Sequence, residues 1–371
     1  MWIHNRVWIS VFCVAAFCRN LTGTPPSSVA EPTDELFAKA PVCHLRIEMS
    51  ESNFNVLSSQ RGSLNREQDQ RPEVAAVVWD GDRCYSNVAV HLKGGPGSFR
   101  AVDSKPSLTL KFNKWVKHQR FHGLEKISLN NSAQDGSFVS EKLCRELYLQ
   151  SGIPVPRSDY ATVELNRRPL GLYVLTEGWD KTFLERCFAG AKGCLYDPSQ
   201  QDVDQKLRIT TGDREEGQQR LHELAQACSE PDMARRLEKL EGILDLDRFV
   251  TFMALESLTW SWDNYSQNRN NYRLFFHRDT ARFTFMPQGM DQMFSLPEAP
   301  LIGGAGGLVS RSFLEIPGQW KRLRNRASDL RGGIFSPALL TNRVNAISAT
   351  ASLSRPRRSP IGVPPPHRSA R

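Results

Sequence analysis

The residues best suited to chemistry lie within positions 262–294, where an acid, a cluster of amides, two β-type runs and a second acid follow one another. Asp263 is the first acid, Asn268 and Asn271 belong to the amide cluster, and Asp291 is the second acid. Phosphoryl transfer with bound Mg²⁺ needs such a set: one carboxylate orients the attacking hydroxyl, and an amide and another carboxylate hold the metal. Because Asp and Asn also favour turns, a plain loop is the simpler interpretation of this stretch on its own.

A glycine-rich stretch, KGGPGSF, begins at Lys93 and includes Gly94 and Gly95. It connects two β-type runs, and such a loop can lay backbone N–H groups against phosphates. It does not match a Walker motif and no helix follows it directly, which excludes a P-loop. Lys93 and Lys111, in the next run, are well placed for phosphate contact. An ordinary hairpin loop with solvated lysines is the alternative.

The charge of the chain is concentrated at its C-terminal end. The 371 residues carry a net charge of +8 and are 40% hydrophobic, as in an ordinary globular protein. Residues 351–371 hold five arginines and no acid, and without these arginines the net charge is only +3. Basicity is therefore mostly a property of the tail, and we do not expect a nucleic-acid partner.

The N-terminus is typical of a secretory signal. Residues 7–18 form an apolar run that is too short to span a bilayer, and a Pro/Ser/Thr-rich linker follows it. We therefore assign residues 1–32 to a signal peptide and linker. No other segment is apolar enough to cross a membrane, so we expect an exported protein in the periplasm, at the cell envelope or secreted.

The number of cysteines permits disulfides in an exported chain. Six cysteines remain after the predicted signal, and Cys187 and Cys194 are close enough in sequence to close a small loop. Cys144 lies on an apolar helix face, where a buried free thiol is the simpler expectation. No C-x-x-C spacing occurs, which argues against a zinc site.

Hydrophobic periodicity divides the chain into a β-rich first part and a more helical second part. Strands are predicted at residues 41–49, 73–79, 84–93, 107–112, 121–131, 160–165, 171–177, 272–276 and 282–286. Helices are predicted at residues 50–61, 135–150, 181–188, 220–227, 233–243, 246–258, 319–330 and 340–347. The polar, charge-mixed residues 196–242 are interpreted as an insertion or a lid.

The order of these parts is that of a bilobal protein kinase. Strands carry the glycine-rich loop and a lysine, a helix bearing Glu141 follows, and a connector ends at Glu177 before the helical part. We therefore predict an α+β, atypical protein-kinase-like bilobal fold with a β-rich N-lobe and a mostly helical C-lobe. The N-lobe covers 41–177, the C-lobe covers 178–347 with an insertion at about 196–242, and 348–371 form a disordered basic tail. The D-F-G string of ordinary protein kinases does not occur.

In the stretches that carry these parts, the sequence resembles the CotH kinase family, atypical kinases named for spore coat protein H. The matching stretches cover about residues 88–294 and read HLKGGPGSFR, KPSLTLKF, FHGLEKISLNN, SEKLCREL, GIPVPRSDYATVELNRRPLGLYVLTEGWDKTFLERCF, NNYRLF and MPQGMDQMF. The resemblance implies an atypical protein-kinase-like fold in a secreted or coat-associated protein. Some members phosphorylate Ser or Thr of coat or extracellular proteins, so it also implies a protein substrate and ATP with Mg²⁺ or Mn²⁺.

The resemblance assigns catalytic and metal roles by position. Asp263 matches the acid before the N-Y motif and would be the catalytic base. Asn271, directly before Tyr272, matches the amide on the metal, with Asn268 as a rival because it stands five residues after Asp263. Asp291 would bind Mg²⁺.

The nucleotide-binding roles follow in the same way. Lys93 or Lys111 would contact the ATP phosphates beside Gly94 and Gly95, and Glu141 would pair with the lysine. Glu177, at the end of the connector, is assigned to the nucleotide site as well.

The sequence departs from the family at its second acid. Many members read P-W-D-x-D, whereas Gln288 and Gly289 replace the Trp and the first Asp here. If that first Asp is the metal ligand, activity is in doubt; if Asp291 serves, activity stands. A non-catalytic cell-surface or coat binding protein is therefore the alternative. A metal-dependent hydrolase built on Asp263 and Asp291 is a third interpretation, which no cluster of histidines supports.

Overall fold

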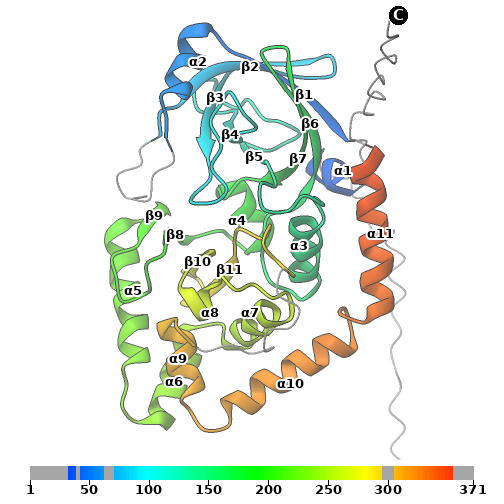
Figure 1. The fold of residues 1–371 in the computed structure, drawn as a ribbon. Helices are drawn as coiled ribbons and strands as arrows, with labels where there is room; N and C mark the ends of the chain where they lie inside the picture. The colour runs from blue at the N-terminus through cyan, green and yellow to red at the C-terminus, as the bar shows by residue number, and fades with distance from the viewer. Residues whose placement is uncertain (1–31, 39–41, 62–70, 295–304, 354–371) are drawn as a thin grey trace, which may run out of the picture.

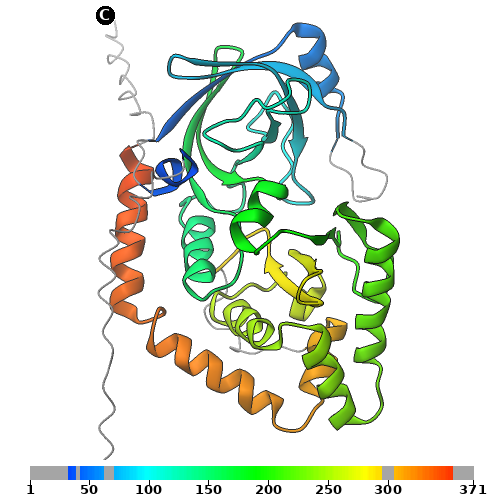
Figure 2. The ribbon, with the colours of Figure 1, turned by 180° about the vertical axis from the view of Figure 1, so that it is seen from behind.

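The computed structural model describes residues 32–38, 42–61, 71–294 and 305–353. The predicted signal peptide and most of the predicted basic tail lie outside the described residues. Figures 1 and 2 show a β-rich part above a mostly helical part. Among the helices described, none combines the length and the apolar character that crossing a membrane requires.

The β-rich part is a closed barrel whose strands, among the described residues, follow the order β1-β2-β3-β4-β5-β7-β6. Every pair in the barrel is antiparallel except β1 and β6, which run parallel and close it. The strands are β1 Cys43–Glu48, β2 Val74–Asp80, β3 Arg83–Lys93, β4 Ser107–Lys111, β5 Lys126–Asn130, β6 Ser158–Leu165 and β7 Arg168–Glu177. All seven overlap the strands predicted from the sequence.

Alternation of side chains builds the interior of the barrel. Along β2, Val74, Ala76 and Val78 are buried while the residues between them are half-buried, because successive side chains of a strand point to opposite faces. These side chains join one apolar cluster with residues of the other strands. Helix α1 (Pro32–Ala38) adds Leu36 to this cluster, and helix α2 (Glu51–Ser58) adds Leu57.

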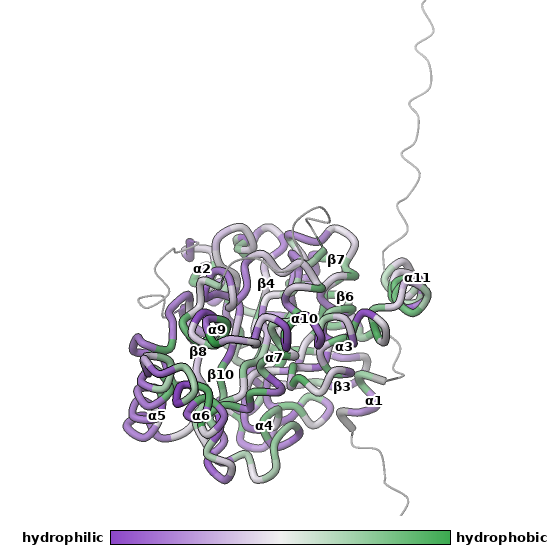
Figure 3. Tube along the Cα trace, turned by 90° about the horizontal axis from the view of Figure 1, so that it is seen from below, coloured by the Kyte–Doolittle hydropathy of each residue, from purple (hydrophilic) through white to green (hydrophobic). Residues whose placement is uncertain are grey.

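The second part contains a four-stranded sheet in the order β11-β10-β8-β9. Its strands are β8 Gly193–Asp197, β9 Arg208–Thr211, β10 Tyr272–His277 and β11 Arg282–Pro287. Its helices are α3 Ser140–Gln150, α4 Lys181–Cys187, α5 Arg214–Cys228, α6 Met233–Ile243, α7 Leu246–Leu258, α8 Tyr265–Asn268, α9 Leu308–Leu314, α10 Gln319–Gly332 and α11 Pro337–Leu353. Seen from below, α5 and α6 lie at one rim, α11 lies at the opposite side, and α7 lies between them (Figure 3).

One apolar core connects the barrel to the helices. It includes Leu147 of α3, Leu172 of β7 and Phe249 of α7, together with residues of the second sheet. The outward faces of β6 and β7 therefore pack on the helical part, while their inward faces fill the barrel. The mixed α+β class predicted from the sequence is confirmed.

Several predicted boundaries are wrong; α5, for example, begins at Arg214 instead of residue 220. Helix α3 begins at Ser140 rather than at Asp135, because Phe138 adopts a positive φ of 66° that a helix cannot contain. Asp135 still caps the turn before the helix: its carboxylate accepts hydrogen bonds from the backbone N–H groups of Ser137 and Ser140, each at 2.9 Å. Helix α11 continues to Leu353, so the first residues of the predicted tail are helical; buried Ile347 and Ala351 hold them against the core.

The segment predicted to be an insertion or lid, residues 196–242, is packed into the second part. It begins inside β8, which pairs with β10, and continues through β9, α5 and α6. Leu221, Leu224 and Leu240 are buried in the shared core. Its status as an insertion stays a prediction.

The six cysteines of the described residues are free thiols. The disulfide considered between Cys187 and Cys194 is not formed, since Cys187 lies in α4 while Cys194 is buried within β8. Cys144 is buried on α3, as predicted, and burial raises the pKa of its thiol well above the usual value.

Candidate functional site

The loop that carries Asp263 begins where α7 ends. Trp260 has a positive φ of 54°, which turns the chain away from the helix axis. Asn264 then caps the short helix α8, its side-chain oxygen accepting a hydrogen bond from the backbone N–H of Gln267 at 2.8 Å. Asp263, immediately before this cap, is half-buried. The cap and the turn together fix the backbone on both sides of the predicted base.

Two amides bind the carboxylate of Asp263. The Nδ2 of Asn270 donates to Oδ2 of Asp263 at 2.8 Å, and the Nδ2 of Asn271 donates to the same oxygen at 3.0 Å. Asn271 also donates to the backbone carbonyl of Asp263 at 2.8 Å. Amide donors stabilise the ionised carboxylate and fix its plane. The structure therefore brings together Asp263 and Asn271, two of the predicted site residues.

Glu256 supports this loop from the buried face of α7 and was not predicted. Its Oε1 accepts a hydrogen bond from the backbone N–H of Tyr265 at 3.0 Å, and its Oε2 accepts from the hydroxyl of Ser266 at 2.5 Å. Glu256 is buried, no cation of the described residues lies beside it, and burial raises its pKa to about 8. Its position among apolar residues in the second half of α7 is the signal that the sequence offers.

Asn271 and Gly289 face each other where the hairpin β10–β11 opens. Both have positive φ values, 50° and 64°. A Cβ atom on Gly289 would lie 2.5 Å from Oδ1 of Asn271, so the side-chain oxygen of Asn271 occupies the place of a larger residue. The carbonyl and the carboxylate of Asp263 both accept hydrogen bonds, so the side-chain nitrogen of Asn271 must face them. The side-chain oxygen of Asn271 therefore points toward Gly289.

Asp291 presents a carboxylate that no other side chain of the described residues binds. It is half-buried, and within the described part of the chain its carboxylate receives no hydrogen bond from another residue and forms no ion pair. Burial, and then repulsion from Glu141, raise its pKa to about 6, and Lys93 opposes this shift. Asp291 therefore lies within electrostatic reach of Lys93 and Glu141.

Lys93 and Glu141 meet through Asn130. The Nζ of Lys93 donates to Oδ1 of Asn130 at 2.6 Å, and the Nδ2 of Asn130 donates to both oxygens of Glu141, at 2.6 and 2.8 Å. Arg145 also donates to Glu141, at 2.7 Å. Burial lowers the pKa of Lys93 to about 8, against the opposite effects of Glu141 and Asp291. The predicted lysine–glutamate pair is thus bridged by an amide that the sequence did not single out.

Lys111 has a different partner. Its Nζ donates to Oε1 of Glu73 at 2.5 Å, and Lys114 also contacts Glu73. The structure therefore does not bring Lys111 to Glu141. Lys111 and Lys93 nevertheless share a neighbour, His91. Burial is the main reason that the pKa of His91 is lowered to about 3, and repulsion from these two lysines lowers it further. The two lysines thus both lie within electrostatic reach of His91.

The glycine-rich loop is folded against itself. The backbone N–H of Gly95 donates to the hydroxyl of Ser98 at 3.0 Å, and Arg71 donates to the carbonyl of Gly94 at 2.7 Å. Gly94 has a φ of 109°, and a Cβ there would lie 3.0 Å from the backbone of Phe99. Only glycine fits at this position.

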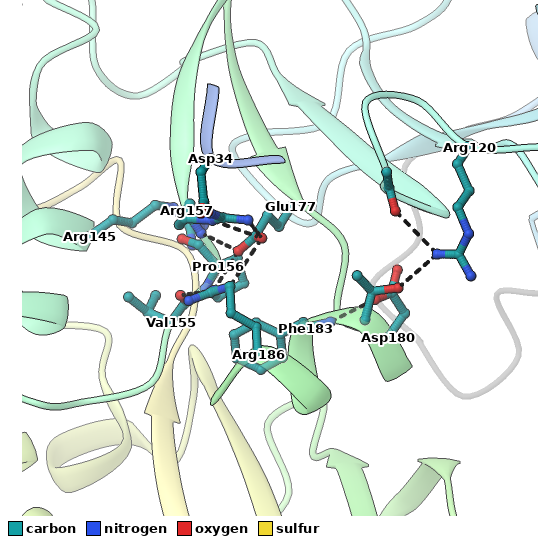
Figure 4. A network of polar contacts seen from close by, with 12 residues as sticks. Asp34, Arg120, Arg145, Val155, Pro156, Arg157, Glu177, Asp180, Phe183 and Arg186 are labelled. Carbon is teal, nitrogen blue, oxygen red and sulfur yellow. Dashed lines mark hydrogen bonds and ion pairs between the residues drawn. The ribbon is translucent and has the colours of Figure 1, made fainter. Parts of the chain in front are cut away.

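Glu177 lies in an ion network at the end of β7 (Figure 4). Its carboxylate accepts hydrogen bonds from Nη2 of Arg157 at 2.7 Å and from Nη2 of Arg186 at 2.5 Å. Arg157 also donates to Asp34 of α1 at 2.6 Å. The side chain of Glu177 is 2% exposed. The carboxylate is occupied by these two arginines, so the geometry gives it a structural role.

The donor set at Asp291 fits a hard divalent cation that also has other ligands. Among the described residues, no three His, Cys, Asp or Glu side chains gather in a way that could hold a metal ion. Mg²⁺, however, is commonly held by one or two carboxylates plus substrate phosphates. Asp291 offers one such carboxylate, and Oδ1 of Asn271 faces Gly289, two residues before Asp291, as a further oxygen ligand. Asn268 does not join them, since it is exposed and donates to the carbonyl of Trp262 at 2.6 Å.

Two comparisons with known proteins agree with one another. The family model described as "CotH kinase protein" matches residues 90–357. The chain is also 22% identical over 240 residues to the inner spore coat protein H of Bacillus subtilis (strain 168). That match covers 59% of this chain and 64% of the relative, so it spans less than two thirds of the relative's length.

Proposed function

Because this chain belongs to the CotH kinase protein family, we propose that it is an exported atypical kinase. It would transfer the γ-phosphoryl group of ATP to Ser or Thr of an extracytoplasmic or coat protein. The barrel part would be the N-lobe and the helical part the C-lobe of a kinase-like fold. The spore coat relative supports a coat or surface location for the substrate.

One arrangement carries this proposal. A carboxylate held by two amides, Asp263, is linked through Asn271 to the loop of a second carboxylate, Asp291. Asp291 is in turn coupled to Lys93 and Glu141. A base, a set of metal-binding oxygens and a phosphate-binding cation are the parts that kinase chemistry requires.

In this proposal, the carboxylate of Asp263 orients the attacking hydroxyl and accepts its proton. The amides of Asn270 and Asn271 hold that carboxylate in one orientation. Lys93, anchored by Asn130, binds phosphate oxygens. Asp291 and Oδ1 of Asn271 would hold Mg²⁺, which when bound neutralises charge on the β- and γ-phosphates. Positioning and electrostatic stabilisation supply most of the rate acceleration.

A non-catalytic binding protein is the second candidate, and Gly289 favours it. The family's first acid at this position is absent, and the oxygen of Asn271 stands where its side chain would begin. A site with only one metal-binding carboxylate would bind nucleotide more weakly. In that case the fold would serve binding at a coat or cell surface.

A thermal-shift titration with ATP, with and without Mg²⁺ or Mn²⁺, separates the two candidates. We expect a metal-dependent rise in melting temperature that Asp291→Asn removes. The matched control is Asp279→Asn, an exposed acid at the opposite end of the same hairpin, which should keep the rise. No shift under any condition would favour the binding protein.

Transfer of radiolabelled phosphate to a protein substrate then tests the base. Asp263→Ala should abolish transfer while the ATP-dependent thermal shift remains. Transfer at the parent rate in this variant would exclude Asp263 as the base.

A further inference from the structure

A depression at the turn end of the hairpin β10–β11 is separate from the site described above. It has a volume of about 460 Å³ and is lined by Phe188, Asp245, Arg248, His277, Thr280, Arg282 and Thr284. His277 pairs with Arg282 at this end of the ladder, whereas Tyr272 pairs with Pro287 at the end that carries Asn271 and Gly289. Its volume falls within the range of small-ligand sites.

The hydroxyl of Thr284 is a polar group in the lining of the depression, and no other described residue binds it. Thr284 is 4% exposed, and within the described part of the chain no hydrogen bond engages its hydroxyl. Because this hydroxyl is not among the buried polar atoms that lack a partner, it opens onto the depression and not into the protein interior. A bound molecule with oxygen acceptors can therefore receive a hydrogen bond from it.

The depression carries more positive than negative charge. Arg248 lies 3.0 Å from Asp245, so those two side chains neutralise each other. Arg282 is exposed and has no carboxylate partner among the described residues. A guanidinium group binds an oxyanion through parallel hydrogen bonds, so this excess charge selects an anionic ligand.

An aromatic wall completes the depression. The ring of Phe188 lies 4.5 Å from the ring of Phe275 and 5.9 Å from that of His277. Nε2 of His277 donates to the carbonyl of Ala189 at 2.8 Å, since a carbonyl only accepts, and Nδ1 lies 3.1 Å from the hydroxyl of Thr280. These contacts hold the wall in place for a flat organic group.

We propose that this depression binds a small phosphate monoester. Its phosphoryl group would contact Arg282 and the hydroxyl of Thr284, and its organic part would pack on Phe188. A second arginine, Arg248, lies beside the same space and adds to the positive field. This site does not depend on the kinase function proposed above.

Isothermal titration calorimetry with the full-length protein, in the absence of nucleotide, tests the proposal. The probes are phenyl phosphate, inorganic phosphate and phenol. We expect phenyl phosphate to bind saturably, inorganic phosphate to bind more weakly, and phenol not to bind. Equal binding of phenyl and inorganic phosphate would overturn the role of the aromatic wall and assign the site to the free anion.

Three variants locate the binding. Arg282→Ala and Thr284→Val should each weaken phenyl phosphate about tenfold or more, as expected when a charge-assisted or buried hydrogen bond is lost. Thr284→Val keeps the side-chain shape and removes only an unpartnered hydroxyl, so it should fold as well as the parent. The control is Arg324→Ala, an exposed arginine of α10 without a carboxylate partner in the described residues, which should bind like the parent.

Two results would overturn the proposal. One is the absence of saturable binding of either phosphate by the parent chain. The other is binding that Arg282→Ala and Thr284→Val both leave unchanged, because the phosphate would then lie elsewhere on the protein.

Discussion

Replacing Gly289 by Ala should destabilise the protein in two separable ways. The first is the backbone: an L-residue at a φ of 64° costs about 1 kcal/mol relative to glycine. The second is the contact: the new Cβ would lie 2.5 Å from Oδ1 of Asn271 and force that side chain to move. Asn271 then loses two hydrogen bonds to Asp263, which contribute about 1–3 kcal/mol together. The expected total loss is about 2–4 kcal/mol.

The control is Gly152→Ala, since Gly152 also has a positive φ, 75°, but nothing lies within 4 Å of its Cβ position. This variant should show only the backbone cost of about 1 kcal/mol. Urea unfolding followed by tryptophan fluorescence at constant pH measures both free energies of unfolding.

A double-mutant cycle isolates the contact. In an Asn271→Gly background the side chain that clashes is absent, so Gly289→Ala should cost only the backbone term, and the coupling free energy should be about 1–3 kcal/mol. If Gly289→Ala cost no more than Gly152→Ala, or if its cost were the same in both backgrounds, the packing of Asn271 between Asp263 and Gly289 would be refuted.

Three further outcomes are expected. The folded carboxyl of Glu256 keeps its proton to about pH 8, while the unfolded one releases it near 4.5; stability should therefore fall with rising pH across this window, and less steeply in Glu256→Gln, as urea unfolding at several pH values would show. Parallel curves would contradict this. Glu177→Gln should cost about 3 kcal/mol by leaving two arginines without their shared carboxylate, yet keep any ATP-dependent thermal shift; a lost shift at unchanged stability would return Glu177 to the nucleotide site. Alkylation of the native protein, read by mass spectrometry, should label exposed Cys84 first and buried Cys144 only after unfolding, and a disulfide-linked peptide would disagree with the free thiols.

The sequence predicts most elements of this fold because their patterns are strong. The boundaries of α7, Leu246–Leu258, match the prediction, since a strongly apolar segment with helical spacing begins directly after the capping Asp245 and ends before Thr259. Helices α8 and α9 were missed because each is short, and α8 exists only through the cap of Asn264 and the support of Glu256. The helix propensity of a short segment does not reveal tertiary contacts of this kind.

The candidate site was predictable in its residue types but not in its pairings. Lys93 and Lys111 lie on adjacent antiparallel strands, and nothing in either strand tells which lysine reaches Glu141. Asn130 decides this by accepting from Lys93, and Glu73 holds Lys111 instead. The sequence shows Glu177 only as an acid at the end of a strand. It does not tell whether the carboxylate binds a ligand or, as in the structure, two arginines.

The parallel pairing of β1 with β6 also sets the order in which the chain can fold. Nδ1 of His44 in β1 lies 2.8 Å from Oγ1 of Thr162 in β6, across a sequence separation of 118 residues. During synthesis, which starts at the N-terminus, β1 can pair with β2 on one side, but its other side stays unpaired until β6 has been made. Contacts of such long range slow folding, and an open strand edge invites pairing with other chains. Closure of the barrel would thus be a late event, and the interval before it is the time at which this protein most needs protection from aggregation.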